Sequence, residues 1–252
     1  MFVLLLILLL TPNIGYALQC ITNCSLGAYL FSQKFNIPDG KCQQRVSKSV
    51  CSILMTFDYH TNLYYVTFSS LIESVDYFII SSLPYLSYSI NYQCSKQTDC
   101  VLQYGTNRID EMVGRAYNAR DIYGQLAPII GNSLKNTSIQ CYNMKNEIVI
   151  CSSDEICSID FDQLENRIIS RDCKQSYGPR VYVYDREDRV KLEVECNRNL
   201  CNTNEVISQI KIVLKNNGLT DANGRRIADG NKQTISSLLM TFSLFFIIFY
   251  HL

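Results

Sequence analysis

The chain has 252 residues with 23 basic and 23 acidic side chains, so its formal net charge is zero. Because the charges balance, no overall field favours binding to nucleic acid or to an anionic membrane surface. Of the two histidines, His60 and His251, the second lies in the C-terminal tail, so a His-based triad or a His-rich metal site has at most one candidate residue. We therefore expect no catalytic residues, no metal site and no cofactor, and we interpret His60 as an exposed turn residue.

The N-terminal end predicts a signal peptide over residues 1–17. An apolar run occupies residues 1–10, and Gly15 and Ala17 put small residues at the positions that a signal peptidase reads. About ten apolar residues are too few to span a bilayer, which argues against an uncleaved anchor. All twelve cysteines follow the expected cut, so we expect an oxidising compartment and a framework of disulfide bonds.

The C-terminal end predicts a glycosylphosphatidylinositol (GPI) anchor. A polar stalk over residues 204–235 contains small residues, and an apolar tail fills residues 236–252. A single transmembrane helix is the alternative, but this apolar run is short and no basic residue follows it. The expected location is the outer face of the plasma membrane. The candidate attachment residues are Ala222, Asn223, Ala228 and Asp229.

Two asparagines, Asn23 and Asn136, lie in glycosylation acceptor patterns. Asn136 is in a polar stretch between the two halves of the chain, whereas Asn23 lies between two cysteines. We therefore expect Asn136 to be the better acceptor.

The first half of the chain, residues 18–105, is a cysteine-rich module that we expect to be mainly β. Two aromatic and β-branched runs, residues 52–59 and 63–68, flank a polar break and predict a hairpin. Further β-prone runs follow at residues 77–80 and 85–92. The six cysteines of this module are Cys20, Cys24, Cys42, Cys51, Cys94 and Cys100.

Residues 106–131 favour a helix instead of strands, because apolar residues recur there at helical spacing. Thr106 or Asn107 is the expected cap. We interpret residues 106–138 as a helical linker between two modules, with a helical extension packed on the first module as the rival reading. The apolar residues that carry the pattern are Ile109, Met112, Val113, Ala116, Ile122, Leu126 and Ile129.

The second half, residues 139–203, again predicts strands. Residues 147–151, 157–161 and 166–170 are strand-like, and residues 190–196 alternate between apolar and charged side chains. Each half is too small to depend on its core alone, so about three disulfides in each would add several kcal/mol of stability. The cysteines of this half are Cys141, Cys151, Cys157, Cys173, Cys196 and Cys201. The expected fold class is mainly β and disulfide-rich, with two small modules joined by a helical segment.

The cysteine spacing of the second half is Cys-x9-Cys-x5-Cys-x15-Cys-x22-Cys-x4-Cys-Asn, preceded by Gln140 and ending at Asn202. Over residues 140–202 this pattern resembles the three-finger family, which includes snake neurotoxins, lymphocyte-antigen-six proteins and the urokinase receptor. Both cysteines of the family's usual third-finger disulfide are missing. The resemblance implies the pairs Cys141–Cys157, Cys151–Cys173 and Cys196–Cys201. It also implies that Asn202 hydrogen-bonds backbone at the palm from which the fingers spread.

The first half resembles the family more loosely, as a divergent three-finger module. The resemblance implies the pairs Cys20–Cys42, Cys24–Cys51 and Cys94–Cys100. Val101 stands where the family has its asparagine. Six cysteines admit fifteen pairings, and their spacing alone does not choose among them.

The resemblance implies a GPI-anchored binding protein with a receptor, adhesion or channel-modulating role and an extracellular or membrane protein as its partner. Four residues of the expected third finger are candidate contacts, because aromatic residues and arginine dominate interface energies. These are Tyr182, Tyr184, Arg186 and Arg189. Packing of the tyrosines within the sheet is the alternative. A structural coat glycoprotein is a second functional class, and a secreted enzyme using acidic pairs such as Asp160 and Asp162 is a less favoured third.

Overall fold

A computed structural model describes residues 17–69, 74–81, 84–95, 97–98, 100–131 and 138–227. Residues 1–16, Asn136, Ala228, Asp229 and the apolar tail lie outside this part, and so do the expectations that concern them. The expected fold class is confirmed: the protein is mainly β, it contains six disulfides, and helices lie between two β-rich regions in the sequence. No helix in the described ranges is long and apolar enough to cross a membrane.

The described residues form two compact units. The first contains residues 17–75 and 87–116, and the second contains residues 76–86 and 117–227. These units differ from the contiguous ranges expected from the sequence, because residues 76–81 pair with a strand about a hundred residues later in the chain.

The first unit has a four-stranded antiparallel sheet and a separate strand pair. In the sheet, the order is β7 (Tyr85–Cys94, which belongs to this unit from Ser87 on), β4 (Cys51–Asp58), β5 (Leu63–Ser69) and β2 (Cys24–Leu30). The separate pair consists of β1 (Leu18–Ile21) and β3 (Arg45–Lys48). Helix α2 (Cys100–Gly114) packs on β4.

The hairpin predicted around His60 is present as β4 and β5. Alternate β4 side chains, Ile53, Met55 and Phe57, are fully buried, as the period-2 pattern requires. In the turn, the Asp58 carboxylate accepts the backbone N–H of His60 at 2.9 Å, and Asn62 has a positive φ of 56°. His60 is exposed in this turn, as expected.

The single helix expected over residues 106–131 is in fact two helices. The first, α2, begins at Cys100, ahead of the expected cap at Thr106 or Asn107. Ala116 interrupts the helical path because its φ is 46°, in the left-handed region. Asn118 then caps α3 (Ala119–Ile130) by accepting the Asp121 N–H at 3.1 Å. Helix α2 packs on β4 of the first unit, as the alternative of a helical extension expected, and α3 belongs to the second unit.

The disulfides of the first unit correct one expectation. The structure joins Cys20 to Cys51 and Cys24 to Cys42, so the implied pairs Cys20–Cys42 and Cys24–Cys51 are wrong. The reason is the β1–β3 pairing, which sets Cys20 opposite Val46, a short turn before Cys51. The third pair, Cys94–Cys100, is present and closes the turn into α2.

The second unit has a five-stranded antiparallel sheet, a short strand pair and two helices. The sheet order is β11 (Arg167–Gln175), β10 (Glu155–Asp162), β13 (Arg189–Cys196), β12 (Arg180–Arg186) and β6 (Val75–Ser81). The short pair is β8 (Gln140–Tyr142) with β9 (Ile148–Ile150). Helix α3 packs on β13 and on helix α4 (Asn204–Asn216).

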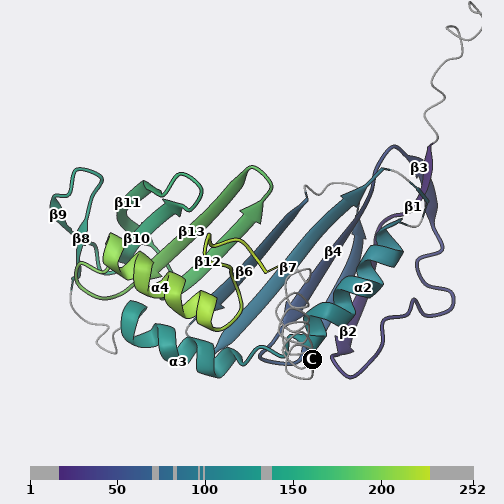
Figure 1. Cartoon of the computed structure of the whole chain (residues 1–252), viewed down its shortest axis with the longest axis horizontal. Coiled ribbons are helices and arrows are strands. Elements are labelled where there is room, and N and C mark those ends of the chain that lie inside the picture. Colours follow the sequence, from purple (N-terminus) through teal and green to yellow (C-terminus); the bar gives the residue numbers. More distant parts are fainter. Residues whose placement is uncertain are drawn as a thin grey trace, which may run out of the picture. The chain divides into compact units, whose positions relative to one another are not determined.

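One face of the five-stranded sheet is apolar, and the two helices cover it (Figure 1). Its inward side chains include Ile159, Val183, Leu192 and Val194, each exposed by 1% or less. From the helices, Ile122, Leu126, Ile207, Ile210 and Leu214 are buried in the same way. The opposite face carries polar and aromatic side chains.

The expected polar stalk over residues 204–235 is a folded part of the second unit as far as Ile227, the last described residue. Thr203 caps α4 by accepting the Val206 N–H at 3.3 Å. Ile207, Ile210 and Leu214 follow at helical spacing and pack inward. The stalk expectation was wrong over residues 204–227 because these few apolar positions lie within an otherwise polar stretch.

Candidate functional site

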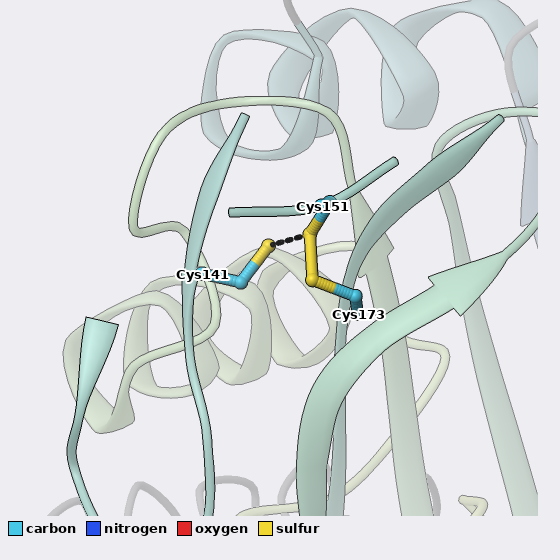
Figure 2. Close-up of side chains that lie close together, drawn as sticks. All are labelled: Cys141, Cys151 and Cys173. Carbon is cyan, nitrogen blue, oxygen red and sulfur yellow. Dashed lines mark hydrogen bonds between the residues drawn. A yellow bond between two sulfur atoms is a disulfide. The ribbon is translucent and has the colours of Figure 1, made fainter. Parts of the chain in front are cut away.

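The base of the second unit is a cluster of disulfides. Cys141 is joined to Cys157, Cys151 to Cys173 and Cys196 to Cys201, which are the three pairs that the family resemblance implied. The Sγ atoms of Cys141 and Cys151 lie 2.9 Å apart, which brings two disulfides into contact (Figure 2). All twelve cysteines fall in the described residues and all are paired. The sulfur atoms of Cys141, Cys151 and Cys173 lie close together. Metal ligation requires a thiolate. Because each of these sulfurs belongs to a disulfide bond, the cluster stabilises the fold and offers no metal ligands in the oxidised protein.

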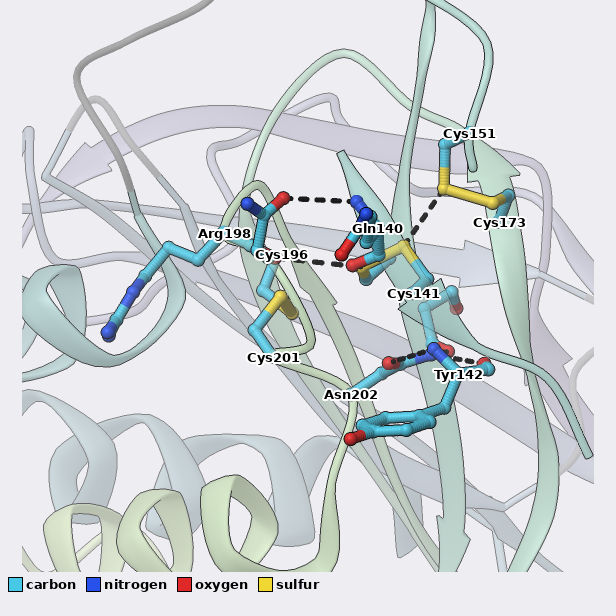
Figure 3. Close-up of a disulfide and its surroundings, with 12 residues drawn as sticks. Gln140, Cys141, Tyr142, Cys151, Cys173, Cys196, Arg198, Cys201 and Asn202 are labelled. Carbon is cyan, nitrogen blue, oxygen red and sulfur yellow. Dashed lines mark hydrogen bonds between the residues drawn. A yellow bond between two sulfur atoms is a disulfide. The ribbon is translucent and has the colours of Figure 1, made fainter. Parts of the chain in front are cut away.

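Asn202 connects the disulfide cluster to two strands. Its side chain is fully buried. The Oδ1 atom accepts the Tyr142 N–H at 2.9 Å, and Nδ2 donates to the Tyr142 carbonyl at 2.8 Å and to the Ser158 carbonyl at 3.2 Å (Figure 3). One amide thus ties the end of the disulfide loop to both β8 and β10.

The loop closed by Cys196 and Cys201 also contacts its surroundings through its backbone. The Leu200 N–H donates to the Gln140 carbonyl at 2.7 Å, and the Asn199 side chain accepts the Gln140 N–H at 3.0 Å. Leu200 has a φ of 54°, which turns the chain back toward Cys201. On the other side, the Asn197 N–H donates to the Ile130 carbonyl at 3.0 Å. The loop therefore joins β8 to the end of α3.

Arg171 is a residue of this base that sequence reasoning missed. It lies on β11, is 8% exposed, and its guanidinium carbon lies 5.3 Å from the centre of the Tyr142 ring. It donates to the Asn143 carbonyl at 3.2 and 3.0 Å and to the Asn146 side chain. Arg171 thus holds the turn between β8 and β9 against β11. Its charge, in a strand of many exposed residues, gave no sign of this burial.

The candidate contact residues lie together on the open face of the five-stranded sheet. Cross-strand partners share a face, and Tyr182 pairs with Glu193, Tyr184 with Lys191 and Arg186 with Arg189. On the other side of β12, Tyr184 pairs with Tyr77 and Tyr182 with Ile79. We call the four residues Tyr77, Ile79, Tyr182 and Tyr184 the tyrosine patch. All four are half-buried.

Within the tyrosine patch, the rings of Tyr77 and Tyr182 are 5.9 Å apart, so the alternative of packing within the sheet is partly realised. Burial, with smaller contributions from Tyr77, Tyr184 and Glu193, raises the pKa of Tyr182 to about 12. Its hydroxyl therefore stays protonated at neutral pH and can donate a hydrogen bond. The patch combines apolar rings with hydroxyl groups, as binding surfaces often do.

Next to the tyrosine patch lies an ion-pair network centred on Glu195. This carboxylate is fully buried, 2.8 Å from Lys174 Nζ and 2.7 Å from Arg180 Nε. Ser176 Oγ also donates to it. Partial burial would lower the pKa of Lys174, but its hydrogen bonds to Glu193 and Glu195 outweigh this effect and raise it. The alternating pattern of β13 marked Glu195 as an exposed residue and gave no sign of the network.

Arg186 and Arg189 lie at the tip of the β12–β13 hairpin, where Arg186 pairs with Asp188. The C-terminal described segment is fixed beside this tip. Arg225 donates to the Asp185 carboxylate at 3.2 Å and to the Glu187 carbonyl at 3.0 Å, and the Arg226 N–H donates to Asp185 at 2.8 Å. The Arg226 side chain also pairs with Asp76 on β6. These contacts of Arg225 and Arg226 therefore hold the tip of the β12–β13 hairpin in place.

The remaining candidates lie apart from this surface. Asn23 is exposed in the turn between β1 and β2. Ala222 and Asn223 are exposed in a tight turn that Asp221 organises by accepting the N–H groups of Asn223 and Arg225 at 2.8 and 2.9 Å. Asp160 pairs with Lys191 at 2.8 Å, and Asp162 accepts the N–H groups of the turn that follows it. The Asp160 carboxylate therefore stabilises the sheet, and the Asp162 carboxylate stabilises the turn that follows β10.

The chain matches no protein-family model, and no curated protein matches it.

Proposed function

We propose that this protein is an extracellular binding protein of the three-finger type that is held at the cell surface by a GPI anchor. The observation that carries the proposal is the disulfide base with its buried asparagine. Cys141–Cys157 and Cys151–Cys173 interleave along the chain, and Cys196–Cys201 closes a short loop directly before Asn202.

The strand arrangement supports the same assignment. Three successive hairpins leave the disulfide base: β8–β9, β10–β11 and β12–β13. The last strand, β13, pairs with β10 from the second hairpin, which places β10 between β11 and β13. In the three-finger family that this half resembles, the third finger likewise returns to the central finger. Two features depart from the family: β12 pairs with β6, and α4 follows Asn202.

The tyrosine patch is the surface that we propose to bind a protein partner. Its residues lie on β6 and β12, which pair with each other, and β12 also pairs with β13 in the five-stranded sheet, so little conformational entropy is lost on binding. Tyr182 and Tyr184 supply large amphipathic contact areas, and the neighbouring Lys174, Arg180 and Glu193 supply charge at its border. Interfaces are typically enriched in tyrosine and arginine in this way.

The proposed GPI anchor rests on the sequence of the tail, and the contacts of the described C-terminal segment support one pair of the candidate attachment residues. Attachment at Ala222 or Asn223 would cleave off Arg225 and Arg226, which neutralise Asp185 and Asp76. Leaving buried carboxylates without these partners would cost several kcal/mol. We therefore propose attachment beyond Ile227, with Ala228 and Asp229 as the candidates.

The proposal is tested on cells that express the full chain. Phosphatidylinositol-specific phospholipase should release the protein from the surface, and the released, fluorescently labelled protein should bind a panel of cell lines saturably. Excess unlabelled protein should abolish that binding. Failure of release would contradict the lipid anchor, whereas binding that unlabelled protein does not reduce would contradict the function as a binding protein.

A further inference from the structure

Strand β9 presents an apolar and unprotected edge. Ile148 and Ile150 are 54% and 70% exposed, and Met144 in the preceding turn is 53% exposed. Among the described strands, β9 pairs with β8 alone. The strand consists of Ile148, Val149 and Ile150, so all three of its side chains are β-branched and none is charged.

The backbone of this edge is available for pairing. The Asn143 N–H donates to the Glu147 carbonyl and the Cys151 N–H to the Ile139 carbonyl, both at 2.9 Å. Antiparallel pairing alternates, so the N–H and C=O groups of Ile148 and Ile150 point away from β8. The matching outward groups of Tyr142 on β8 are both bonded to Asn202. A second strand would satisfy those of Ile148 and Ile150 in a similar way.

The outer edge of the large sheet in the same unit is built differently. Strand β11 carries Arg167, Asp172 and Lys174, none of which is buried. Charged side chains of this kind discourage other strands from adding to an edge. Because β9 has none of this protection within the strand, its edge is suited to association.

We propose that the β9 edge pairs with the β9 edge of a second copy of this chain. An antiparallel pair centred on Val149 sets Ile148 opposite the partner's Ile150, and Ile150 opposite the partner's Ile148. This register satisfies the outward groups of both isoleucines on both copies with four backbone hydrogen bonds. A register shifted by two residues is centred on Ile148 or on Ile150. In either case only the isoleucine at the centre lies opposite an isoleucine of the second copy, and the other isoleucine does not. The pairing is twofold symmetric, as in most homodimers.

Side chains and charges also suit a second copy. The register matches β-branched residues with β-branched residues across the strands, a favourable combination. Exposed Glu147 lies directly before β9. In the proposed register it lies opposite the uncharged Cys151 of the second copy, so no like charges lie directly opposite each other across the pair. The edge is small compared with the roughly 1,000 Å² of a stable interface, so the contact forms at the high local concentration of a membrane surface.

Cysteine cross-linking of the full chain in cell membranes tests this pairing. In the proposed register the two Val149 Cα atoms lie about 4.5 Å apart, within the range of a disulfide bond. We expect Val149→Cys to give a dimer on a non-reducing gel. Ile212→Cys, at a 58% exposed position on α4, should remain monomeric. Adding Ile150→Asp to Val149→Cys should reduce the dimer at least tenfold, whereas adding Ile212→Asp should not.

Three outcomes would overturn the proposal. The first is a Val149→Cys protein that stays monomeric while it reaches the surface in normal amounts with the Cys141–Cys157 bond intact. The second is equal dimer formation by Ile212→Cys, or a dimer that Ile150→Asp does not reduce, which would indicate random collision. The third is cross-linking to a different polypeptide, which would assign the edge to another partner. The pairing rests on the proposed location at a membrane, and the test gives the same answer whether a lipid or a transmembrane helix holds the chain there.

Discussion

The side-chain amide of Asn202 forms a matched pair of hydrogen bonds with the backbone of Tyr142, accepting from its N–H at 2.9 Å and donating to its carbonyl at 2.8 Å. A third bond, to the Ser158 carbonyl, completes the set. Because the amide is fully buried, these backbone groups would have no replacement partner from water if it were removed.

We expect Asn202→Ala to lower the free energy of unfolding by about 2–4 kcal/mol, because it leaves three buried backbone groups without a hydrogen-bond partner. Asn202→Asp should be at least as damaging, since a carboxylate cannot donate to the two carbonyls. Chemical denaturation under non-reducing conditions measures both. Asn204→Ala, at an exposed position two residues later, is the matched control and should change stability by less than about 0.5 kcal/mol. Equal effects at the two positions would contradict the role given to Asn202.

The Glu195 network predicts an asymmetry between its partners. Glu195 is fully buried, whereas the side chains of Lys174 and Arg180 are 43% and 41% exposed. Replacing both Lys174 and Arg180 by Met leaves the buried Glu195 carboxylate without a cationic partner. We expect this change to lower the free energy of unfolding by about 3–5 kcal/mol. Glu195→Gln leaves two cations that water can hydrate, so it should cost less than about 2 kcal/mol.

The control for this asymmetry is the triple replacement of Lys174, Arg180 and Glu195 by Met. It should recover most of the loss, because no buried charge remains. Unfolding free energies of the three variants give the comparison. A Glu195→Gln protein less stable than the double variant would contradict the network as described.

The proposed place of lipid attachment can be tested on the anchored peptide. Because Arg225 and Arg226 hold the C-terminal segment on Asp185 and Asp76, we expect mass spectrometry of the lipid-linked peptide to find Arg226 within it. A peptide that ends at Ala222 or Asn223 would contradict this. In the same protein, Arg226→Ala should lower the free energy of unfolding by about 2–4 kcal/mol through the loss of its ion pair with Asp76.

Acid should weaken the open face of the sheet through Glu193. Burial opposes the charged form of Glu193, but hydrogen bonds and charges from Lys174 and Lys191 outweigh it and hold its pKa below the usual 4.5. A carboxyl whose pKa is lower in the folded state contributes stability above its unfolded pKa and loses it as the pH falls toward the folded value. The contribution is therefore complete above about pH 5 and fades below about pH 4.5.

The measurement is the free energy of unfolding of the wild type and Glu193→Gln at several values between about pH 6 and pH 3. The wild type should be the more stable at the upper end, and the difference should shrink toward the lower end. Glu187→Gln, at the exposed hairpin tip, controls for a general change of charge. A difference that is constant with pH would contradict the assignment to Glu193.

Local patterns were enough to predict many of the strands, whereas the disulfide pairs of the second unit were implied by the family resemblance. The alternation of Val190, Leu192 and Val194 with charged residues marked β13, and the hairpin around His60 was recognisable from its turn residues. These features depend on neighbours within a few residues, which is why the sequence specifies them.

Features that depend on distant partners could not be predicted. The nested bonds Cys20–Cys51 and Cys24–Cys42 follow from the pairing of β1 with β3, which cysteine spacing does not encode. The burial of Glu195 depends on Lys174 and Arg180, which come from two other strands. The same holds for the pairing of β6 with β12, which brings Tyr77 into the tyrosine patch.

Binding by a tyrosine-patch variant is the most direct test of the account as a whole. Tyr182→Ala combined with Tyr184→Ala removes two half-buried rings of the patch, whereas Tyr177→Ala removes a fully exposed ring outside it. The measurement is the affinity of each labelled full-length protein, released from its membrane, for cells that bind the wild type. We predict at least a tenfold loss of affinity for the double variant and no change for Tyr177→Ala. Unchanged affinity in the double variant, with all six disulfides in place, would contradict the proposal that this surface binds the partner.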